Sequence, residues 1–519
     1  MIGSILLCLL PAFLGGTVGH LDATLEFEDD LLSYQFVDID GQGVQSLCVA
    51  LRSKEGRREL RILEMTRRGF NPEPRHTISI LEDILAYGFA DVREEPGREL
   101  IFLTRTGAYS YSLTIDGYRN NIARLVTENL LYDVPDSRAF PFWSYTIEAP
   151  GSDLILLPGR RDFSVWGPQR GEKSGDGSYE AWTRFDSDST ARDVRSQANR
   201  GDGAGLSLSG SGELRANTGD PDGGIFLSES DGSSTLLADA KYYPAPAVVD
   251  VNGDGKQDLI LQRDSDLEVY LGGDQGFDGS PTRIESLPDY LLGDDISLQL
   301  TFAHLNSDDL IDLVAVVKAE LKGFENVQMR VFALLNDGKR LLPEEAHQVF
   351  RFEGAQLRVE VADVNADGRN DLLVRKFVLP SMLEAVSGLE FELTFAVFFA
   401  EKRGARPFKR KPDLNQTETF DENNFGDILK NRKILLDCDG DKIPDLVEVD
   451  IQGRIVIRRL IHDSGFFSGD TWEIEKSPWK RFETQGTVVG LRVLDVNGDD
   501  LADIVSPSRN ALTLLLSTK

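Results

Sequence analysis

One phrase recurs along this chain, and it constrains the fold more than any other feature. A few apolar residues lead into a loop of the form Asp-x-Asn-x-Asp-Gly, and an Asp followed by further apolar residues closes the loop. The phrase reads AVVDVNGDGKQDLIL from Ala247, VEVADVNADGRNDLLV from Val359 and VLDVNGDDLADIV from Val493, with variants from Ile434 and Phe302. Such repetition indicates stacked copies of one supersecondary unit.

The spacing of the copies matches the blades of a β-propeller. Fainter copies upstream keep the apolar frame but lose loop carboxylates. The first loop positions are 38, 91, 145, 250, 304, 363, 437 and 495. They lie 53 to 59 residues apart, except for two steps of 105 and 74 residues. A four-stranded blade needs roughly 40–50 residues or somewhat more, so each unit has the right length.

Short β-rich runs on both sides of each loop predict strands. Val248-Val249 and Leu259–Leu261 flank one loop and are bounded by Gly and Asp, which is strand-turn-strand chemistry. We expect an all-β propeller of seven or eight four-stranded blades, with eight favoured. After Asp503 the last blade holds only three strand candidates, and Ala23–Glu28 can supply the fourth. An N-terminal strand in that place closes the ring and removes its exposed edges.

The amino terminus has the pattern of an export signal. An apolar stretch from Ile2 to Leu14 is followed by small residues through Gly19, and it is too short to span a bilayer. We expect a signal peptide at 1–19 and a secreted, periplasmic or extracellular protein. A buried first strand or a short anchor is the alternative, because no Lys or Arg precedes the stretch. Residues 20–519 then form a single propeller domain, with insertions at about 186–240 and 376–432.

Four loops carry oxygen side chains at positions 1, 3, 5 and 9. The residues are Asp250, Asn252, Asp254 and Asp258; Asp363, Asn365, Asp367 and Asp371; Asp437, Asp439, Asp441 and Asp445; and Asp495, Asn497, Asp499 and Asp503. A tight loop turns alternate side chains toward one centre, and Ca²⁺ takes six to eight oxygens. An EF-hand carries its last acid at position 12 within a helix, whereas here the acid at position 9 begins a strand. We therefore expect about four Ca²⁺ sites of another type; turns capped by Asp and Asn without metal are the alternative.

The other loops are weaker candidates for metal binding. His304 takes position 1 of one loop, which leaves a weaker fifth site open at Asn306, Asp308 and Asp312. The loops beginning at positions 38 and 91 lack enough oxygen ligands, and we expect them to bind nothing. Gly occupies position 6 in two of the strong loops, at 255 and 368, where it permits a positive φ; Lys and Asp replace it at 442 and 500.

The charge balance excludes one class of partner. The chain has 86 acidic and 56 basic residues and a formal net charge of −30, which repels phosphate backbones. We expect no nucleic-acid partner and no membrane span in the mature chain. Beyond Cys8 in the apolar stretch, the cysteines are Cys48 and Cys438; they either pair across a closed ring or remain buried thiols. With no CxxC or Cys/His cluster, zinc is not expected.

The loop phrase followed by an apolar strand resembles the FG-GAP/VCBS repeats of bacterial secreted proteins and of integrin α-chain heads. The resemblance covers most of residues 30–519 and is most specific at 247–262, 359–374, 435–449 and 491–506. It implies a propeller, usually seven-bladed, with calcium in the hairpin between the first two strands of a blade. The Asp and Asn residues named above are the implied ligands. FG-GAP dipeptides are not evident, and the chain has eight units rather than seven.

No motif indicates an enzyme. The chain has five His and lacks GxSxG, P-loop and HExxH sequences. We expect a binding or scaffold module for protein or glycan partners at the cell envelope. The alternatives are a glycosidase or lyase on a propeller scaffold and a purely structural exported protein. Arg200–Asp202 spells an adhesion tripeptide, and Trp143, Trp166 and Trp182 are either glycan contacts or core residues.

Overall fold

The structure is a computed structural model that describes residues 19–518 with gaps. The longer gaps are 114–121, 129–139, 141–145, 169–178, 187–191, 194–206, 209–213, 216–240, 320–325, 381–389 and 422–432. The shorter gaps include 42–43, 148–151, 309, 366, 402–405, 440, 442 and 500. The predicted signal peptide apart from Gly19, most of the predicted insertion 186–240, the tripeptide 200–202 and Trp143 thus lie outside the described residues.

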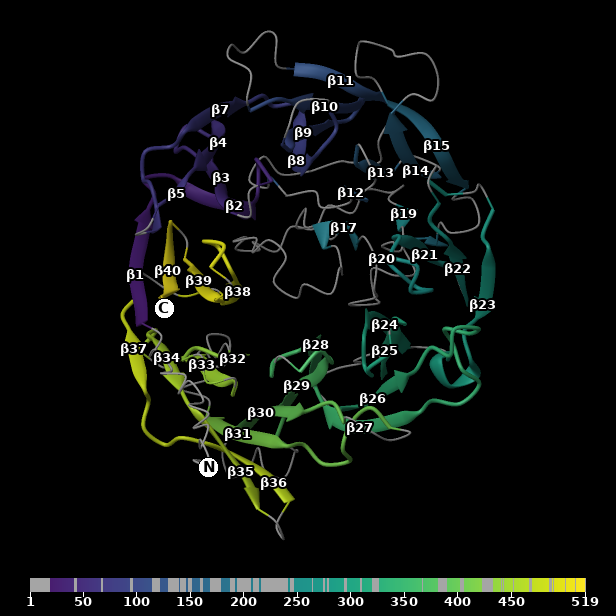
Figure 1. Cartoon of the computed structure of the whole chain (residues 1–519), viewed down its shortest axis with the longest axis vertical. Coiled ribbons are helices and arrows are strands. Elements are labelled where there is room, and N and C mark those ends of the chain that lie inside the picture. Colours follow the sequence, from purple (N-terminus) through teal and green to yellow (C-terminus); the bar gives the residue numbers. More distant parts are fainter. Residues whose placement is uncertain are drawn as a thin grey trace, which may run out of the picture.

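The described strands form a closed ring of eight four-stranded antiparallel sheets, which confirms the eight-bladed β-propeller (Figure 1). The first strand of each blade lies toward the centre of the ring, and the fourth lies on the rim. The one helical element among the described residues is the 3₁₀ turn η1 (Asp289–Leu291).

The strands of the first four blades follow the expected order, with a short extra hairpin in blade 1. Blade 1 has β2 (Asp30–Val37), β3 (Ser46–Arg52), β4 (Arg58–Leu63) and β7 (His76–Ile80), with the pair β5 (Met65–Thr66) and β6 (Gly69–Phe70). Blade 2 has β8 (Ile84–Ala90), β9 (Glu99–Thr104), β10 (Gly107–Tyr111) and β11 (Ile122–Thr127). Blade 3 has β12 (Thr146–Ile147), β13 (Leu154–Pro158), β14 (Asp162–Pro168) and β15 (Tyr179–Asp186). Blade 4 has β20 (Ala247–Val249), β21 (Asp258–Arg263), β22 (Asp266–Tyr270) and β23 (Arg283–Ser286).

The last four blades repeat the pattern. Blade 5 has β24 (Ile296–Ala303), β25 (Asp312–Ala319), β26 (Val327–Leu334) and β27 (Gln348–Gly354). Blade 6 has β28 (Gln356–Ala362), β29 (Asp371–Val378), β30 (Glu390–Phe398) and β31 (Leu414–Asp421). Blade 7 has β32 (Lys433–Leu436), β33 (Asp445–Val449), β34 (Ile455–Arg458) and β37 (Lys480–Phe482). Blade 8 has β38 (Arg492–Leu494), β39 (Asp503–Pro507), β40 (Ala511–Thr518) and β1 (Gly19–Glu26).

Two parts of the chain between blades and strands differ from the simple repeat. Between blades 3 and 4 lie two short pairs: β16 (Arg192–Asp193) with β19 (Lys241–Tyr242), and β17 (Ser207–Leu208) with β18 (Leu214–Arg215). Blade 7 carries a separate hairpin of β35 (Leu460–Gly465) and β36 (Gly469–Ile474) between its third and fourth strands. The region 376–432, expected as an insertion, supplies the third and fourth strands of blade 6, so much of its length is ordinary blade structure.

The N-terminal strand closes the ring as expected. β1 pairs antiparallel with β40, from Gly19 opposite Thr518 to Glu26 opposite Ala511. The strand begins four residues earlier than the predicted Ala23. Because the first and last segments of the chain share one sheet, blade 8 has no missing outer strand, and the ring has no open end.

Apolar residues on both faces of the inner strands pack between neighbouring blades. Between blades 4 and 5 one buried cluster contains Val269, Leu313 and Phe332. Between blades 8 and 1 another joins Leu514 to Val49. The second strands are almost wholly buried because a blade covers each of their faces, as the apolar runs beside the loops predicted. Trp166 lies in such a core and is 6% exposed.

Cys48 and Cys438 are free, buried thiols in blades 1 and 7. Blade 8 lies between those two blades. Ring closure therefore brings the chain ends near each other without joining the two cysteines. Of the two alternatives left open by the sequence, buried thiols are the arrangement in the structure.

Candidate metal centres

All eight repeat loops connect the first and second strands of their blades. Since every blade has the same antiparallel order, these hairpin loops share one face of the ring. The four Asp-rich loops belong to blades 4, 6, 7 and 8. Position 9 begins the second strand in each of them, at Asp258, Asp371, Asp445 and Asp503. This is the hairpin position that the FG-GAP/VCBS resemblance implies for calcium.

Backbone hydrogen bonds link neighbouring loops around that face. In four cases an N–H at position 8 or 9 of one loop donates to a carbonyl at position 1 or 2 of the preceding blade's loop. The bonds are Gln45 N–H to Val496 O at 3.3 Å, Arg98 to Ile39 at 2.7 Å, Asp153 to Asp91 at 2.7 Å and Asn370 to His304 at 2.9 Å. Blade 5 makes a similar link through a side chain, since Asn336 Nδ2 donates to Val251 O at 3.0 Å. Among the described residues, five of the eight junctions between neighbouring loops are linked in this way, and we call these loops the loop belt.

The blade 4 loop winds around the carboxylate at its first position. Asp250 Oδ1 accepts the N–H groups of Gly253 at 2.8 Å and Asp254 at 3.2 Å, and its Oδ2 accepts that of Gly255 at 2.7 Å. Both glycines have a positive φ, of 73° and 81°. A side chain other than Gly is strained in this conformation, so the two glycines let the loop close. The predicted role of Gly255 is confirmed.

Positions 3 and 5 continue the same winding. Asn252 Oδ1 accepts the N–H of Asp254 at 3.0 Å, and Asp254 Oδ1 accepts that of Lys256 at 2.9 Å. Each carboxylate or amide oxygen has a second lone pair, so an oxygen that accepts one N–H can still face a cation. Position 1, 3 and 5 oxygens gathered by a tight turn are the donor set that Ca²⁺ prefers.

The blade 6 and blade 8 loops repeat these contacts. Asp363 accepts the N–H of Asp367 at 3.1 Å and that of Gly368, whose φ is 83°, at 2.8 Å. Asp495 Oδ1 accepts the N–H groups of Gly498 at 2.7 Å and Asp499 at 3.3 Å. The shared geometry follows from the shared sequence pattern. The position 6 residues of blades 7 and 8, 442 and 500, lie outside the described residues.

The blade 7 loop gathers its carboxylates most closely. One oxygen from each of Asp437, Asp439 and Asp441 lies within 4.8 Å of the others, the one such acidic group found among the described residues. Three carboxylates this close repel one another unless a cation lies between them. Asp439 also forms an ion pair with Arg459 at 2.8 Å, which offsets part of that repulsion. The remaining carboxylates of this loop, Asp437, Asp441 and Asp445, are oxygen donors of the kind that Ca²⁺ takes.

The acid at position 9 has a second role that the sequence did not indicate. In four blades its two carboxylate oxygens accept two backbone N–H groups, one from position 2 of its own loop and one from the end of the third strand. For Asp258 the donors are Val251 and Gly272; for Asp312, Leu305 and Asn336; for Asp371, Val364 and Ala400; and for Asp503, Val496 and Ser517. The distances run from 2.7 to 3.2 Å. The acid joins three strands of the blade.

This brace also occurs in loops for which no metal, or only a weaker site, is expected. Glu99 of blade 2 accepts the N–H of Val92 at 3.0 Å, and Asp312 lies in the His304 loop. All these acids are buried. Desolvation raises the pKa of Asp312 and Asp503 to about 6 and that of Asp371 and Asp445 to about 7, against the lowering effect of the N–H bonds. An acid at position 9 is therefore part of the blade, and positions 1, 3 and 5 distinguish the loops.

The blade 5 loop shows what replaces the missing oxygen at position 1. His304 Nδ1 lies 3.0 Å from the carbonyl oxygen of Leu310. That carbonyl is at position 7, where a calcium loop supplies a backbone ligand. Asn306 and Asp308 keep the turn contacts seen in the other loops. The imidazole thus faces the carbonyl that a cation would use, which argues against a fifth site.

The loops of blades 1 to 3 have other contacts. Arg93 at position 3 of the blade 2 loop donates from Nε to Ser110 Oγ at 3.0 Å. Asp153 of blade 3 accepts the N–H of Asp91 at 2.9 Å, so its carboxylate caps the neighbouring loop. Neither arrangement gathers several oxygens around one point.

Comparisons with known proteins do not identify a family. No family model matches the chain, and no curated protein matches it. Solved structures similar to it include a lectin from Agrocybe aegerita that recognises non-reducing terminal N-acetylglucosamine, at 11% identity and a TM-score of 0.35, covering 88% of this chain and 94% of the lectin. The WD40 domain of SCAP from fission yeast has 10% identity and a TM-score of 0.33, covering 96% and 97%. BBS1N in complex with ARL6DN has 8% identity and a TM-score of 0.32, covering 96% of each chain.

At these identities and TM-scores the likeness bears on neither ligand nor activity. The propeller fold is established by the strand pairing itself. None of the helices in the described part of the chain has the length and apolar character needed to cross a membrane.

Proposed function

We propose that this protein is an exported, calcium-loaded propeller of the FG-GAP/VCBS type that acts as a binding scaffold for protein or glycan partners at the cell envelope. The observation that carries the calcium part is the close group of Asp437, Asp439 and Asp441, on a loop that recurs in blades 4, 6 and 8. The four ion sites would be held by the position 1, 3 and 5 side chains of these loops. The acid at position 9 would add a ligand while bracing the blade.

Bound calcium would supply the positive charge that lets these carboxylates lie together. Residues of the chain itself hold the loops in shape. The carboxylates at position 1 fix the turn, a glycine at position 4 or 6 permits it, and backbone bonds connect some of the loops to their neighbours. A rigid face of loops on a closed ring is a surface on which recognition residues keep their positions.

A binding role fits the described residues better than catalysis. The carboxylates of the loops are committed to turns and braces, and the buried thiols of Cys48 and Cys438 have raised pKa values because of desolvation. Such thiols are poor nucleophiles. A glycosidase or lyase remains the alternative, and a screen of polysaccharide substrates with the calcium-loaded protein distinguishes it from a binding module.

Thermal unfolding of the chain lacking residues 1–18, in EDTA and then in millimolar calcium, tests the calcium proposal. A cation bound only by the folded state at 100 times its Kd adds about 2.7 kcal/mol per site. We expect a large, saturable rise in Tm and a calorimetric stoichiometry of about four. No shift in Tm, with no metal retained after purification without chelator, would show that the loops are solvated turns.

A further inference from the structure

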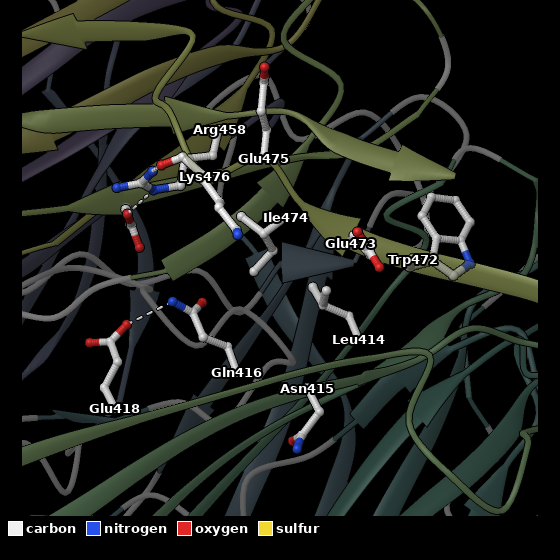
Figure 2. Close-up of a pocket in the computed structure, with 11 residues that line it drawn as sticks. Leu414, Asn415, Gln416, Glu418, Arg458, Trp472, Glu473, Ile474, Glu475 and Lys476 are labelled. Atoms are coloured by element: carbon white, nitrogen blue, oxygen red, sulfur yellow. Dashed lines mark hydrogen bonds and ion pairs between the residues drawn. The ribbon is translucent and has the colours of Figure 1, made fainter. Parts of the chain in front are cut away.

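A groove of about 660 Å³ lies between blades 6 and 7 at the outer part of the ring (Figure 2). One side is β31, the outermost strand of blade 6, and the other is β36 of the extra hairpin, with Glu475 and Lys476 after it. The groove lies outside the loop belt and contains none of the proposed calcium ligands. Its volume is within the range of small-ligand and peptide sites.

Two strand edges border this groove. β31 pairs only with β30, and β36 pairs only with β35, within the described part of the chain. Glu475 N–H donates to Arg459 O at 2.9 Å, in line with the register of β35 and β36. In an antiparallel pair alternate residues face the partner, so the main-chain groups of Trp472 and Ile474 point to the other edge of β36. Strand edges of this kind are templates for pairing with another chain.

The two edges run in the same order along the groove. In Figure 2, Glu418, Gln416 and Leu414 follow one side, and Lys476, Ile474 and Trp472 follow the other. A single extended segment placed antiparallel to both strands therefore has the direction needed to pair with each of them. It would join the four strands of blade 6 to the hairpin of blade 7 in one sheet, which is the mode of recognition called β-strand addition.

The hairpin is held at one end of the groove by aromatic packing. The Trp472 ring lies 4.2 Å from that of His462 and 4.5 Å from that of Phe399, between centroids. Leu414 and Leu460 belong to the same buried cluster. Trp472 lines the groove and is half-buried, and its packing against both rings leaves only part of the indole open to a sugar ring. This favours a peptide over a glycan as the occupant.

The charged residues on the floor are already paired. Lys433 forms ion pairs with Glu418 and, at 3.5 Å, with Glu448, and Arg458 forms one with Glu448 at 2.7 Å. Lys433 and Glu448 are 4% and 9% exposed. The network therefore fixes the floor and leaves little charge there to attract a ligand. Gln416 Oε1 is shielded from solvent and has no hydrogen-bond partner among the described residues, so this wall has an unmet acceptor.

On the hairpin side of the groove, two carboxylates form no ion pair with any described residue. Glu473 and Glu475 are two residues apart on β36 and its extension, and Lys476 is the corresponding cation on this side. Two free carboxylates against one free ammonium make this wall acidic, on a chain whose formal net charge is −30. A basic ligand is attracted both at long range and within the groove.

We infer that the groove between β31 and β36 binds an extended basic peptide segment of a partner protein by β-strand addition. The inference rests on the proposed binding role but not on calcium. The peptide would place Lys or Arg against Glu473 and Glu475 and an apolar side chain against Ile474. Its main chain would supply hydrogen bonds to both strand edges.

A random heptapeptide phage library, selected on the full calcium-loaded chain, tests this inference. We expect enrichment of basic peptides with alternating side chains. The synthetic consensus peptide should lose at least about tenfold in affinity for Glu473→Lys/Glu475→Lys, since two attractions become repulsions. Glu345→Lys/Glu353→Lys is the matched control, because it makes the same charge change at exposed residues of blade 5. The control should bind as the unaltered protein does.

N-methylated peptides test the main-chain pairing directly. Methyl groups on alternate nitrogens block one edge, and methyl groups on the other nitrogens block the opposite edge. Both series should lose binding if the segment lies between two strands. If the peptides bound equally well to the charge-reversed variant, or when N-methylated, they would not bind in this groove by strand addition. The proposed binding role of the protein would not be affected by that result. The peptide proposal would also be contradicted if no peptide were selected, or if a glycan from an array competed for the groove. The calcium proposal is tested separately, by thermal unfolding with and without calcium.

Discussion

The loops of blades 5 and 6 are neighbours that carry the same residues at positions 3, 5 and 9, so among the four oxygen-bearing positions they differ only at position 1. Both place an Asp at position 9, and in each the two oxygens accept N–H groups from position 2 and from the end of the third strand. The blade 6 loop begins with Asp363, which accepts two N–H groups of its own turn. The blade 5 loop begins with His304, which faces the Leu310 carbonyl.

The comparison separates two functions that the motif combines. Position 9 is needed by the blade whether or not the loop holds a cation, because it satisfies N–H groups that are otherwise buried without partners. Position 1 decides whether the loop has an oxygen donor for a cation. A repeat can therefore lack the position 1 oxygen and keep its fold, as blade 5 does, and an acid at position 9 alone is no evidence for calcium.

The largest expected effect is the loss of the brace. Asp371→Ala and Asp312→Ala each leave two buried N–H groups without an acceptor, which costs about 2–4 kcal/mol of the free energy of unfolding. Chemical denaturation in EDTA should show this cost for both variants, since the brace does not require metal. Asp308→Ala, on the exposed part of the blade 5 loop, is the control and should change stability by less than about 1 kcal/mol. If Asp312→Ala lowered the free energy of unfolding only slightly, the brace would matter only in the calcium loops.

The second effect should appear in one loop and not in the other. Asp363→Ala removes the position 1 oxygen of blade 6, and the variant should lose about 2.7 kcal/mol of calcium-dependent stabilisation at 100 times the Kd. His304→Ala should leave the calcium-dependent part unchanged. Unfolding of both variants with and without calcium measures the difference. Equal losses from the two substitutions would remove the distinction between the loops.

Restoring the missing oxygen should convert one loop into the other. His304→Asp returns an acid to position 1 beside Asn306, Asp308 and Asp312, so we expect a fifth calcium site. Isothermal titration should count about five ions instead of about four. Without calcium the added carboxylate should lower stability modestly, by about 1 kcal/mol, through repulsion from its neighbours. A stoichiometry that stays at about four would show that the other differences in the blade 5 loop also prevent binding.

The smallest expected effect concerns the blade 7 loop. Arg459 forms an ion pair with Asp439, and a guanidinium in that place competes with a bound cation. Arg459→Gln should therefore raise the calcium affinity of one site by about two- to fivefold, the scale of one partly exposed ion pair. Arg454→Gln is the control, because Arg454 pairs with Asp450 at 2.7 Å outside the loop. Weaker calcium binding in Arg459→Gln would indicate that Arg459 positions Asp439 for the metal.

Much of the fold follows from local sequence. The repeated loop phrase predicted the hairpin between the first two strands, and its spacing predicted eight blades. The apolar runs beside each loop predicted inner strands covered on both faces, as β9 and β25 are. The shortage of strands after Asp503 predicted the closing strand. These features depend on residues close together in the chain or on a count, so one sequence suffices to find them.

The tertiary structure decided what lies between repeats. The donors to Asp258, Asp312, Asp371 and Asp503 include residues 14 to 29 positions away, at the end of a third strand whose sequence carries no signature for the contact. The links between loops join neighbouring blades through main-chain groups, which any residue provides. The groove beside β36 arises because a hairpin of blade 7 lies against the edge of blade 6. Local sequence therefore determined the loops and the number of blades, whereas contacts between distant backbone groups, set only by packing, determined how the loops are braced and where a partner strand fits.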